Sequence, residues 1–342
     1  MTLDQETLRR KADRVGLALA SGVPVGPTPS WRDYRAWIDR GYAADMDYLS
    51  RPDAIHRRKD PRNILPEAQT VVVVAAPYTV GRKPALPPRH GRVSRYAWGA
   101  DYHRWLLRQL KDLIRDLMET RSASRKVRTY VDTGPILERA WAQAAGLGWI
   151  GKNTNLIHPR LGSYLFLGTA LLDVPLVGSA PTPVEPACGS CTRCLDACPT
   201  GALVAPGVLD ARRCLSYLTI ENRGPIPEAY RPAVGDRVFG CDICQEVCPW
   251  NRKPLEAHAG DPAPDQATLS LTDALMMDAA TFRNRYRDTP IWRATPEGLA
   301  RNAAVVLGNL GDPAAHPYLT RAARDHPSEM VREHATWALA QL

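Results

Sequence analysis

The sequence predicts a multidomain α+β protein, and three features of its 342 residues support that fold class. Helix-like and strand-like patterns alternate through the first half, all eight cysteines lie between Cys188 and Cys248, and the remainder has helical spacing. Length alone suggests two or three domains. We therefore expect an α/β domain at residues 1–180, a cysteine-rich domain at 181–258 and a helical domain at 259–342.

The composition is that of a globular protein. Hydrophobic residues make up 44% of the chain, the mean hydropathy is -0.30, and no apolar run approaches the roughly 20 residues that cross a bilayer. Arg9 and Arg10 suggest a twin-arginine export signal, but charged residues follow at once and the apolar stretch 15–20 is too short for one. We expect an amphipathic helix here and a cytoplasmic protein without a membrane partner.

The elements of the first domain follow from its periodicity. Residues 70–76 (TVVVVAA), 126–131 (KVRTYV) and 164–172 have the character of buried strands. Residues 102–118 have the apolar spacing of a helix. Together they predict a domain large enough for its own core, and the proline-rich stretch 177–186 predicts the passage into the next domain.

Seven cysteines form two runs. The runs are Cys188-x2-Cys191-x2-Cys194-x3-Cys198-Pro199 and Cys241-x2-Cys244-x3-Cys248-Pro249. This spacing is typical of two 4Fe-4S clusters, in which one tight loop gives three thiolates and the cysteine before proline serves the other cluster. The second run lacks its first cysteine, and Cys214 is the substitute. We assign one cluster to Cys188, Cys191, Cys194 and Cys248, and the other to Cys198, Cys214, Cys241 and Cys244.

Zinc sites and disulfides are the competing interpretations of these cysteines. Pairs of the CxxC type alone leave zinc open. The repeated ending x3-Cys-Pro argues against zinc, and disulfides need an oxidising compartment for which the chain shows no signal. The sequence therefore favours a ferredoxin-like redox domain.

The net charge of +8, with a pI near 9.1, comes partly from three basic groups. The groups are Arg51, His56, Arg57, Arg58, Lys59 and Arg62; Arg82, Lys83, Arg89, His90, Arg92 and Arg95; and Arg283, Arg285, Arg287 and Arg293. Any one of these groups by itself is equally well explained as part of the solvated surface. Three groups in one chain favour a polyanionic partner, because phosphate neutralisation releases counterions. Charge alone does not indicate whether that partner is RNA, DNA or a phosphorylated small molecule.

The last domain contains a weak internal repeat. At a spacing of 32 residues, the sequence aligns Ala303, Leu307, Gly308, Asn309 and Leu310 with Ala335, Leu339, Ala340, Gln341 and Leu342. Short helices of this kind resemble HEAT-like repeats, which bind a partner along one face. With about two units, a helical cap that covers the cluster domain is an equally good interpretation.

The densest functional signal outside the cysteines is residues 130–140 (YVDTGPILERA), followed by 148–155 (GWIGKNTN). The first stretch runs from strand into helix, with Pro135 expected at the first helical position and Gly134 or Thr133 at the N-cap. Since Thr133 can cap the helix, Asp132 is free for chemistry. It lies at the end of a strand, where ligands of α/β sheets gather.

These stretches identify a family that the chain resembles over nearly all its length, the epoxyqueuosine reductases. The resemblance rests on residues 131–168 (VDTGPILERAWAQAAGLGWIGKNTNLIHPRLGSYLFLG), the cluster segment ending in residues 241–251 (CDICQEVCPWN), and the HEAT-like helices. It implies an N-terminal cobalamin-binding domain. It also implies that epoxyqueuosine is reduced to queuosine at the tRNA wobble position, with electrons relayed through two 4Fe-4S clusters.

The resemblance further implies roles for particular residues. Asp132 matches the general acid, which is needed because ring opening leaves an alkoxide. An aspartate with an ordinary pKa, about 3.9, is ionised at neutral pH, so burial against corrin and substrate would have to raise the pKa of Asp132. The candidates for contact with cobalamin are Arg57, Tyr96, Lys152, Asn155, His158 and Ser216. For His158, which precedes Pro159, we favour a loop histidine over a cobalt ligand.

The implied partners are a tRNA carrying epoxyqueuosine and an external electron donor of flavodoxin or ferredoxin type, and we expect a monomer. Two other classes remain open. A cobalamin-dependent reductive dehalogenase is disfavoured by the charge of +8 and by the lack of an export signal. A non-catalytic electron-transfer protein would hold two clusters and bind no corrin.

Overall fold

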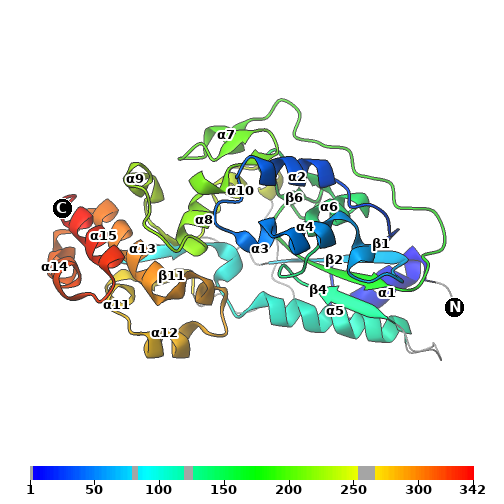
Figure 1. The fold of residues 1–342 in the computed structure, drawn as a ribbon, viewed down its shortest axis with the longest axis horizontal. Helices are drawn as coiled ribbons and strands as arrows, with labels where there is room; N and C mark the ends of the chain where they lie inside the picture. The colour runs from blue at the N-terminus through cyan, green and yellow to red at the C-terminus, as the bar shows by residue number, and fades with distance from the viewer. Residues whose placement is uncertain (1–2, 79–83, 119–125, 253–265) are drawn as a thin grey trace.

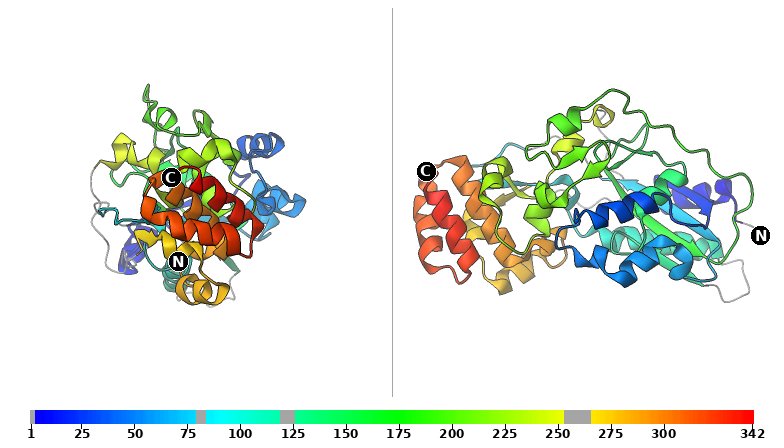
Figure 2. Two further views of the ribbon diagram at one scale, coloured as in Figure 1. Left: turned by 90° about the vertical axis from the view of Figure 1, so that its left-hand side faces the viewer. Right: turned by 45° about the horizontal axis from the view of Figure 1, so that its top comes forward.

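The structure, a computed structural model, describes residues 3–78, 84–118, 126–252 and 266–342. The described part is an elongated α+β molecule, with the N-terminal sheet towards one end and the C-terminal helices at the other (Figure 1). Within these residues, no helix has the length and apolar character needed to cross a bilayer. The two turned views in Figure 2 show the C-terminal helices stacked at their end of the molecule.

The N-terminal sheet has four strands in the order β1-β2-β7-β4, and each neighbouring pair is antiparallel. The strands are β1 (Leu19–Pro24), β2 (Thr70–Pro77), β7 (Leu165–Leu172) and β4 (Val127–Tyr130). The three predicted strands are confirmed. All eight residues of β2 are buried, because helices cover both faces of the sheet at this central strand.

Helices cover both faces of this sheet, and alternate residues of each strand pack against the helices of opposite faces. On one face, Val72 and Val74 of β2 pack with α1 (Gln5–Arg14) and α5 (Tyr102–Met118). On the other, Val71 and Val73 pack with α6 (Glu138–Ala144). Successive residues of a strand point to opposite faces, so one apolar run fills both cores. The predictions of a helix at 102–118 and of an amphipathic N-terminal helix are confirmed.

A second sheet joins segments from all three expected domains. Its order is β10 (Arg237–Phe239), β3 (His90–Val93) and β11 (Thr268–Ser270), so β3 leaves the N-terminal region to lie between the other two. One hydrophobic core contains Val93, Phe239 and Leu271 together with residues of the C-terminal helices. Packing is therefore continuous across the boundary expected at residue 258.

The remaining elements are short in the cysteine-rich region and longer in the C-terminal region. The helices are α2 (Trp31–Asp39), α3 (Asp47–Ser50), α4 (Pro52–Lys59), α7 (Arg193–Asp196), α8 (Leu215–Ile220), α9 (Arg231–Val234), α10 (Ile243–Glu246), α11 (Leu271–Leu275), α12 (Ala279–Tyr286), α13 (Thr295–Leu310), α14 (His316–Asp325) and α15 (Glu329–Leu339). Two hairpins are formed by β5 (Trp149–Ile150) with β6 (Leu156–Ile157), and by β8 (Leu203–Ala205) with β9 (Val208–Leu209). Single turns of 3-10 helix lie at Pro61–Asn63, Arg95–Ala97, Ala211–Arg213, Glu228–Tyr230, Pro249–Asn251, Pro290–Ala294 and Pro313–Ala315.

Helix α13 is the centre of the C-terminal region. It packs on α11 and α15 and also on α8, α9 and β10 of the cysteine-rich region, and its residues 298–308 are all buried. Gly308 lets α15 approach closely, because an added Cβ would lie 2.8 Å from the Cα of Ala338. A helix buried on every side has no free face for a partner. This packing supports the interpretation of α13 as part of a cap.

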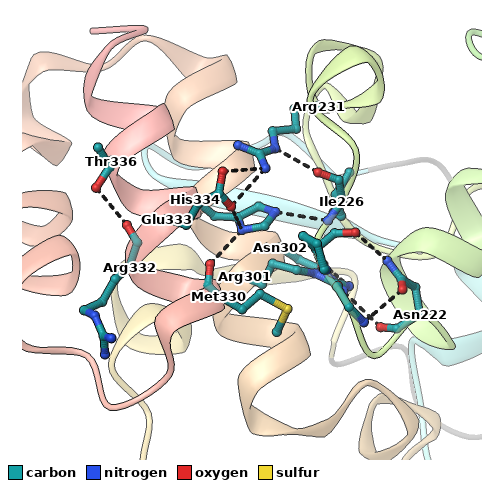
Figure 3. A network of polar contacts seen from close by, with 12 residues as sticks. Asn222, Ile226, Arg231, Arg301, Asn302, Met330, Arg332, Glu333, His334 and Thr336 are labelled. Carbon is teal, nitrogen blue, oxygen red and sulfur yellow. Dashed lines mark hydrogen bonds and ion pairs between the residues drawn. The ribbon is translucent and has the colours of Figure 1, made fainter.

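Polar contacts connect this cap to the cysteine-rich region (Figure 3). The fully buried Arg301 donates hydrogen bonds to the backbone carbonyls of Leu218, Asn222 and Gly224. Beside it, the amide of Asn302 donates to the carbonyl of Thr219 at 2.7 Å. Burial lowers the pKa of Arg301 to about 10, so it stays charged at neutral pH. These contacts fix the end of α8, whose first residue follows Cys214.

A second group of contacts lies on α15. The ring nitrogen Nε2 of His334 accepts the backbone N–H of Ile226 at 3.1 Å. Glu333 pairs with the buried Arg231 at 2.8 Å. The cap is therefore joined to the cysteine-rich region by buried directional bonds as well as by apolar packing (Figure 3).

We predict that Arg301→Met destabilises the protein by about 3 kcal/mol, because three buried carbonyls lose their charged donor. Denaturant unfolding of protein purified without oxygen measures the loss. The matched control is Arg324→Met, since Arg324 is 76% exposed and pairs only with an adjacent aspartate. Equal stability of the two variants would contradict the role given to Arg301.

Candidate active site

The first set of cysteine thiols lies in one neighbourhood. Burial raises the pKa of the Cys248 thiol, and negative charge on Cys188 and Cys191 raises it further. The pKa of Cys194 is likewise raised by burial and by Cys188 and Cys248. These mutual effects require the four sulfurs to be close together. They form the first set expected from the sequence.

The second set shows the same coupling. The pKa of Cys214 is raised by burial and by Cys198, and that of Cys241 is raised to about 12 by burial and by Cys214. Burial and both Cys241 and Cys214 raise the pKa of Cys244. Burial also acts on Cys198, but backbone N–H groups directed at its sulfur, among them that of Ala202 at 3.2 Å, lower the pKa overall.

None of the eight cysteines forms a disulfide. In the part of the chain that the structure describes, no three His, Cys, Asp or Glu side chains lie close enough to share one metal ion. A 4Fe-4S cluster spreads its four thiolates over the corners of a cube, so its ligands do not meet at a point.

The hairpin of β5 and β6 explains the GWIGKNTN stretch. From its turn, Lys152 Nζ donates to the carbonyls of Gly189 and Cys191 at 2.7 and 3.0 Å. Next to it, Asn153 donates to the carbonyl of Cys244 at 3.3 Å. On the other side, Arg139 of α6 donates to the carbonyl of Thr154 at 2.6 Å. The hairpin thus connects both cysteine loops to α6.

Asp132 lies in the loop between β4 and α6, in a left-handed backbone conformation with φ of 58°. Its N–H donates to Glu138 Oε1 at 2.9 Å, and its Oδ2 lies 3.2 Å from His103 Nε2. The Asp132 side chain keeps 64% exposure, so this carboxylate is open to solvent. The hydroxyl of Thr133 contacts the carbonyl of Val131 instead of capping a helix.

Two expectations for this loop are wrong. Helix α6 begins at Glu138 with Leu137 at its N-cap, so Pro135 lies in the loop and neither Gly134 nor Thr133 caps the helix. The tight turn at Asp132 occupies the residues that the helix was expected to use. The sheet is antiparallel, so the rule that places ligands at the strand ends of parallel sheets does not apply here. Asp132 nevertheless makes no capping bond.

His103 is placed by the start of α5. Asp101 Oδ1 accepts the backbone N–H of His103 at 3.0 Å and faces its ring Nδ1 at 2.6 Å. The His103 ring stacks on Tyr102, whose ring stacks in turn on Phe166 of β7. The imidazole is therefore held by the helix cap on one side and by an aromatic stack on its face.

The pKa values of the three titratable groups in and beside this loop are shifted in different directions. Burial opposes a charge on His103, but hydrogen bonds to Asp101 and Asp132 raise its pKa to about 9. Burial would raise the pKa of Asp132, but the hydrogen bond and charge of His103, with the charge of Arg139, lower it. For Glu138, burial and repulsion by Asp132 raise the pKa to about 8. In the protein alone the pKa of Asp132 is therefore lowered and that of Glu138 raised, and the rise expected at Asp132 on burial against corrin and substrate stays a prediction.

Three of the six candidate cobalamin contacts lie towards this loop. Tyr96 packs edge-on against Tyr102 at 6.2 Å, and its pKa is raised by burial and by the charge of Asp132. Asn155 belongs to the turn that Arg139 binds. Arg57 is exposed on α4, and its charge acts on Tyr130 at the end of β4.

The other three candidates make contacts inside the protein. Lys152 binds the first cysteine loop, and the hydroxyl of Ser216 accepts the backbone N–H of Cys241 at 3.1 Å. His158 is 9% exposed, and its Nδ1 accepts the backbone N–H of Leu161 at 3.1 Å. Burial and Arg160 lower the pKa of His158 to about 4, which keeps it neutral. These contacts are those of a loop histidine.

Many of the basic residues are engaged by the protein itself. Arg89 pairs with Asp312, Arg92 with Asp236, and Arg293 with Glu221. Arg58 is buried and donates to backbone carbonyls. Arg82 and Lys83 lie outside the described residues. A solvated or internally paired role therefore accounts for much of the second and third groups.

Comparisons with known proteins agree with this site. A 4Fe-4S double cluster binding domain matches residues 187–251, a PBS lyase HEAT-like repeat matches 299–325, and the model described as epoxyqueuosine reductase QueG, DUF1730, matches 58–133. The chain is 42% identical to the epoxyqueuosine reductase of Pseudomonas aeruginosa, over 89% of this chain and 84% of that one. This chain belongs to the epoxyqueuosine reductase family.

Other members of the family extend the match. The epoxyqueuosine reductase of Escherichia coli is 38% identical over 99% of this chain and 90% of its own. An epoxyqueuosine reductase solved with an epoxyqueuosine-modified tRNA-Tyr stem loop has a TM-score of 0.90 at 32% identity, covering 98% and 89% of the chains. The Bacillus subtilis member, solved with its aspartate-bearing catalytic loop swung out of the active site, has a TM-score of 0.88 at 32% identity, over 98% and 89%.

Sequence reasoning missed His103, Glu138 and Arg139. Glu138 and Arg139 stand in the stretch that was singled out, but their roles depend on where α6 begins. His103 lies 29 residues before Asp132, at the start of a helix whose sequence signal is only apolar spacing. The one local signal was Asp101, which caps that helix.

We predict about eight irons and eight acid-labile sulfides per chain purified without oxygen, because two clusters account for all eight cysteines. Cys214→Ser is expected to lose about half the iron, since it removes one ligand of one cluster. Cys194→Ser is the matched variant and is expected to lose the other half. Four irons with bound zinc in the wild type would contradict the assignment.

Proposed function

We propose that this chain reduces epoxyqueuosine to queuosine at the wobble position of tRNA. The observation that carries the proposal is the hydrogen-bonded path from both cysteine loops, through the hairpin of β5 and β6, to Arg139 and the Asp132 loop. A redox centre is thereby held against an open carboxylate. Relatives that match nearly the whole chain favour this reaction over the dehalogenase and the electron carrier.

The electrons pass through two 4Fe-4S clusters held by the two cysteine sets. The raised pKa values of Cys194 and Cys248 in one set, and of Cys214, Cys241 and Cys244 in the other, support this ligand assignment, because a cationic iron centre relieves the repulsion among neighbouring thiolates. The N–H groups directed at Cys198 stabilise its thiolate further. An external flavodoxin or ferredoxin would supply the electrons one at a time.

The face beside Asp132 fits a corrin. A corrin has broad apolar faces and a rim of amide groups, and here the charge of Asp132 acts on both Tyr96 and Tyr102, while the charge of Arg139 acts on Asp132. When bound, cobalamin supplies a reduced cobalt centre that reacts with the epoxide. We assign contacts to Tyr96 and Asn155. Lys152 and Ser216 order the neighbouring cysteine loops, and His158 orders its own turn.

The chain itself supplies the proton and the orientation. Opening the epoxide leaves an alkoxide, and Asp132 is the open carboxyl group at which a proton is delivered to that oxygen. Glu138 accepts the N–H of Asp132 and so holds the strained turn that presents it. Arg139 fixes the hairpin on the other side.

The tRNA partner is bound in part by charge. Arg57 is exposed on α4 near the end of β4, the strand that leads to the Asp132 loop. We propose that it contacts the backbone of the anticodon arm. We further propose that the enzyme acts as a monomer in the cytoplasm, where tRNA and reduced electron carriers are available.

We predict that Asp132→Asn lowers single-turnover conversion of epoxyqueuosine tRNA by roughly 10²-fold, the usual scale for a lost general acid. Iron content is expected to stay at the wild-type value, because the amide keeps the size of the side chain. Asp278→Asn, which replaces the exposed N-cap of α12, is the matched control and is expected to keep full turnover. Near wild-type turnover by Asp132→Asn would remove Asp132 from the mechanism.

Binding of tRNA is expected to weaken as salt rises, and Arg57→Ala is expected to reduce the slope of log K against log[salt] by about one. Filter binding over a range of salt concentrations measures the slope. Arg324→Ala, at an exposed position on α14, is the control and should leave the slope unchanged. Equal affinity for unrelated duplex DNA would count against a dedicated tRNA enzyme.

A further inference from the structure

Both ring nitrogens of His103 face carboxylates. Nδ1 lies 2.6 Å from Asp101 Oδ1, and Nε2 lies 3.2 Å from Asp132 Oδ2. An ionised carboxylate only accepts hydrogen bonds, so each nitrogen must carry a hydrogen to satisfy both contacts. With both carboxylates ionised, these contacts fit an imidazolium cation at His103. Its partner Asp132 is then ionised and holds no proton of its own.

The proposed reaction consumes protons as well as electrons. Removing the epoxide oxygen to leave an alkene takes two electrons and two protons and releases one water. The electrons come from the external low-potential carrier through the clusters. The protons must reach the substrate oxygen through the protein, and the ionised Asp132 cannot supply them alone.

We propose that His103 is the proton-holding partner of Asp132, which passes the proton of His103 to the substrate oxygen. The Nε2 proton of His103 first passes to Asp132, which leaves His103 a neutral imidazole and Asp132 a neutral carboxyl group. As the carbon–oxygen bond breaks, its electron pair stays on oxygen and takes this proton, and Asp132 returns to the carboxylate. His103, 29% exposed, then regains a proton from solvent and supplies the second one. The inference rests on the proposed function, and His103 is a positioning residue that acts through Asp132.

The surroundings of His103 favour this role. Its charged and titratable neighbours come from the start of α5, from the Asp132 loop and α6, and from the segment after α12: they are Asp101, Tyr102, Arg104, Asp132, Glu138, Arg139 and Asp288. The two carboxylates in direct contact dominate and hold the pKa of His103 at about 9. Asp101 also accepts the backbone N–H of His103 at the start of α5, so the carboxylate that faces the ring is itself held in place.

The first test is the pH profile of single turnover by protein assembled with both clusters and chemically reduced. Wild-type turnover is expected to fall above pH 9, by about tenfold for each further pH unit, as His103 loses its proton. His103→Gln keeps a donor to Asp132 but cannot be charged. We expect it to be slower by at least roughly tenfold at pH 7 and to lack this fall.

Two further variants sharpen this test. Asp101→Asn keeps a capping oxygen but removes one negative charge, so the fall is expected to begin at lower pH. His316→Gln, an exposed residue of α14, is the matched control and should reproduce the wild-type profile. A His103→Gln profile parallel to wild type would overturn the proposal, because it would show that His103 only packs.

A second readout does not depend on activity. Because folding raises the pKa of His103 from 6.5 to about 9, its stabilisation is fully present below pH 6.5 and is lost as pH rises through 9. The difference in melting temperature between wild type and His103→Gln should therefore shrink between pH 6.5 and 9.5. A difference independent of pH would overturn the proposal.

The two measurements separate this proposal from the proposed function. If wild-type protein leaves epoxyqueuosine tRNA unchanged while the melting difference still varies with pH, the function fails and the delivery of protons to that substrate fails with it. If turnover is normal and the melting difference is constant, only the role of His103 fails.

Discussion

The hairpin of β5 and β6 is the constraint on which the site depends. Its turn bonds to one cysteine loop through Lys152, to the other through Asn153, and to α6 through the carbonyl of Thr154. At the base of the hairpin, Trp149 packs edge-on against Trp250, next to Cys248. Electron transfer between centres needs fixed separations, and these bonds fix the cysteine loops relative to Asp132.

Three neighbouring titratable groups around the Asp132 loop have pKa values shifted in different directions. Asp132 is stabilised as an anion, His103 as a cation, and Glu138 is raised towards a neutral carboxyl. Neighbouring titratable groups whose pKa values are pushed apart in this way are typical of acid–base sites. The strained backbone of Asp132 is held by Glu138, so the Glu138 carboxyl orders the loop that presents the proposed proton donor.

The C-terminal helices resemble a repeat that binds partners, but their packing is that of a cap. The most apolar of them, α13, is buried against the cysteine-rich region, and Arg301 and Asn302 bind the backbone of α8. Because α8 follows Cys214, the cap supports a cysteine that we propose as a cluster ligand. The weak repeat in the sequence reflects helix packing, which both interpretations share.

Local rules determined much of this protein from the sequence alone. Cysteine spacing is local chemistry and needed no tertiary information, and the run at 70–76 is apolar enough to read as a central strand. The helix at 102–118 follows from its apolar period. The position of Asp132 at the end of a strand singled it out, and its role as general acid came from the family resemblance.

Only the tertiary structure decided the features that depend on contacts between residues far apart in the sequence. Asp132 is paired with His103, 29 residues earlier, which lowers the pKa of Asp132 because a neighbouring cation outweighs desolvation. The start of α6 shifted to Glu138 because Asp132 takes up a left-handed turn. The strand at 90–93 joins β10 and β11, which are far along the chain. Contacts of this kind produce no periodic pattern in the sequence, so only the folded structure shows them.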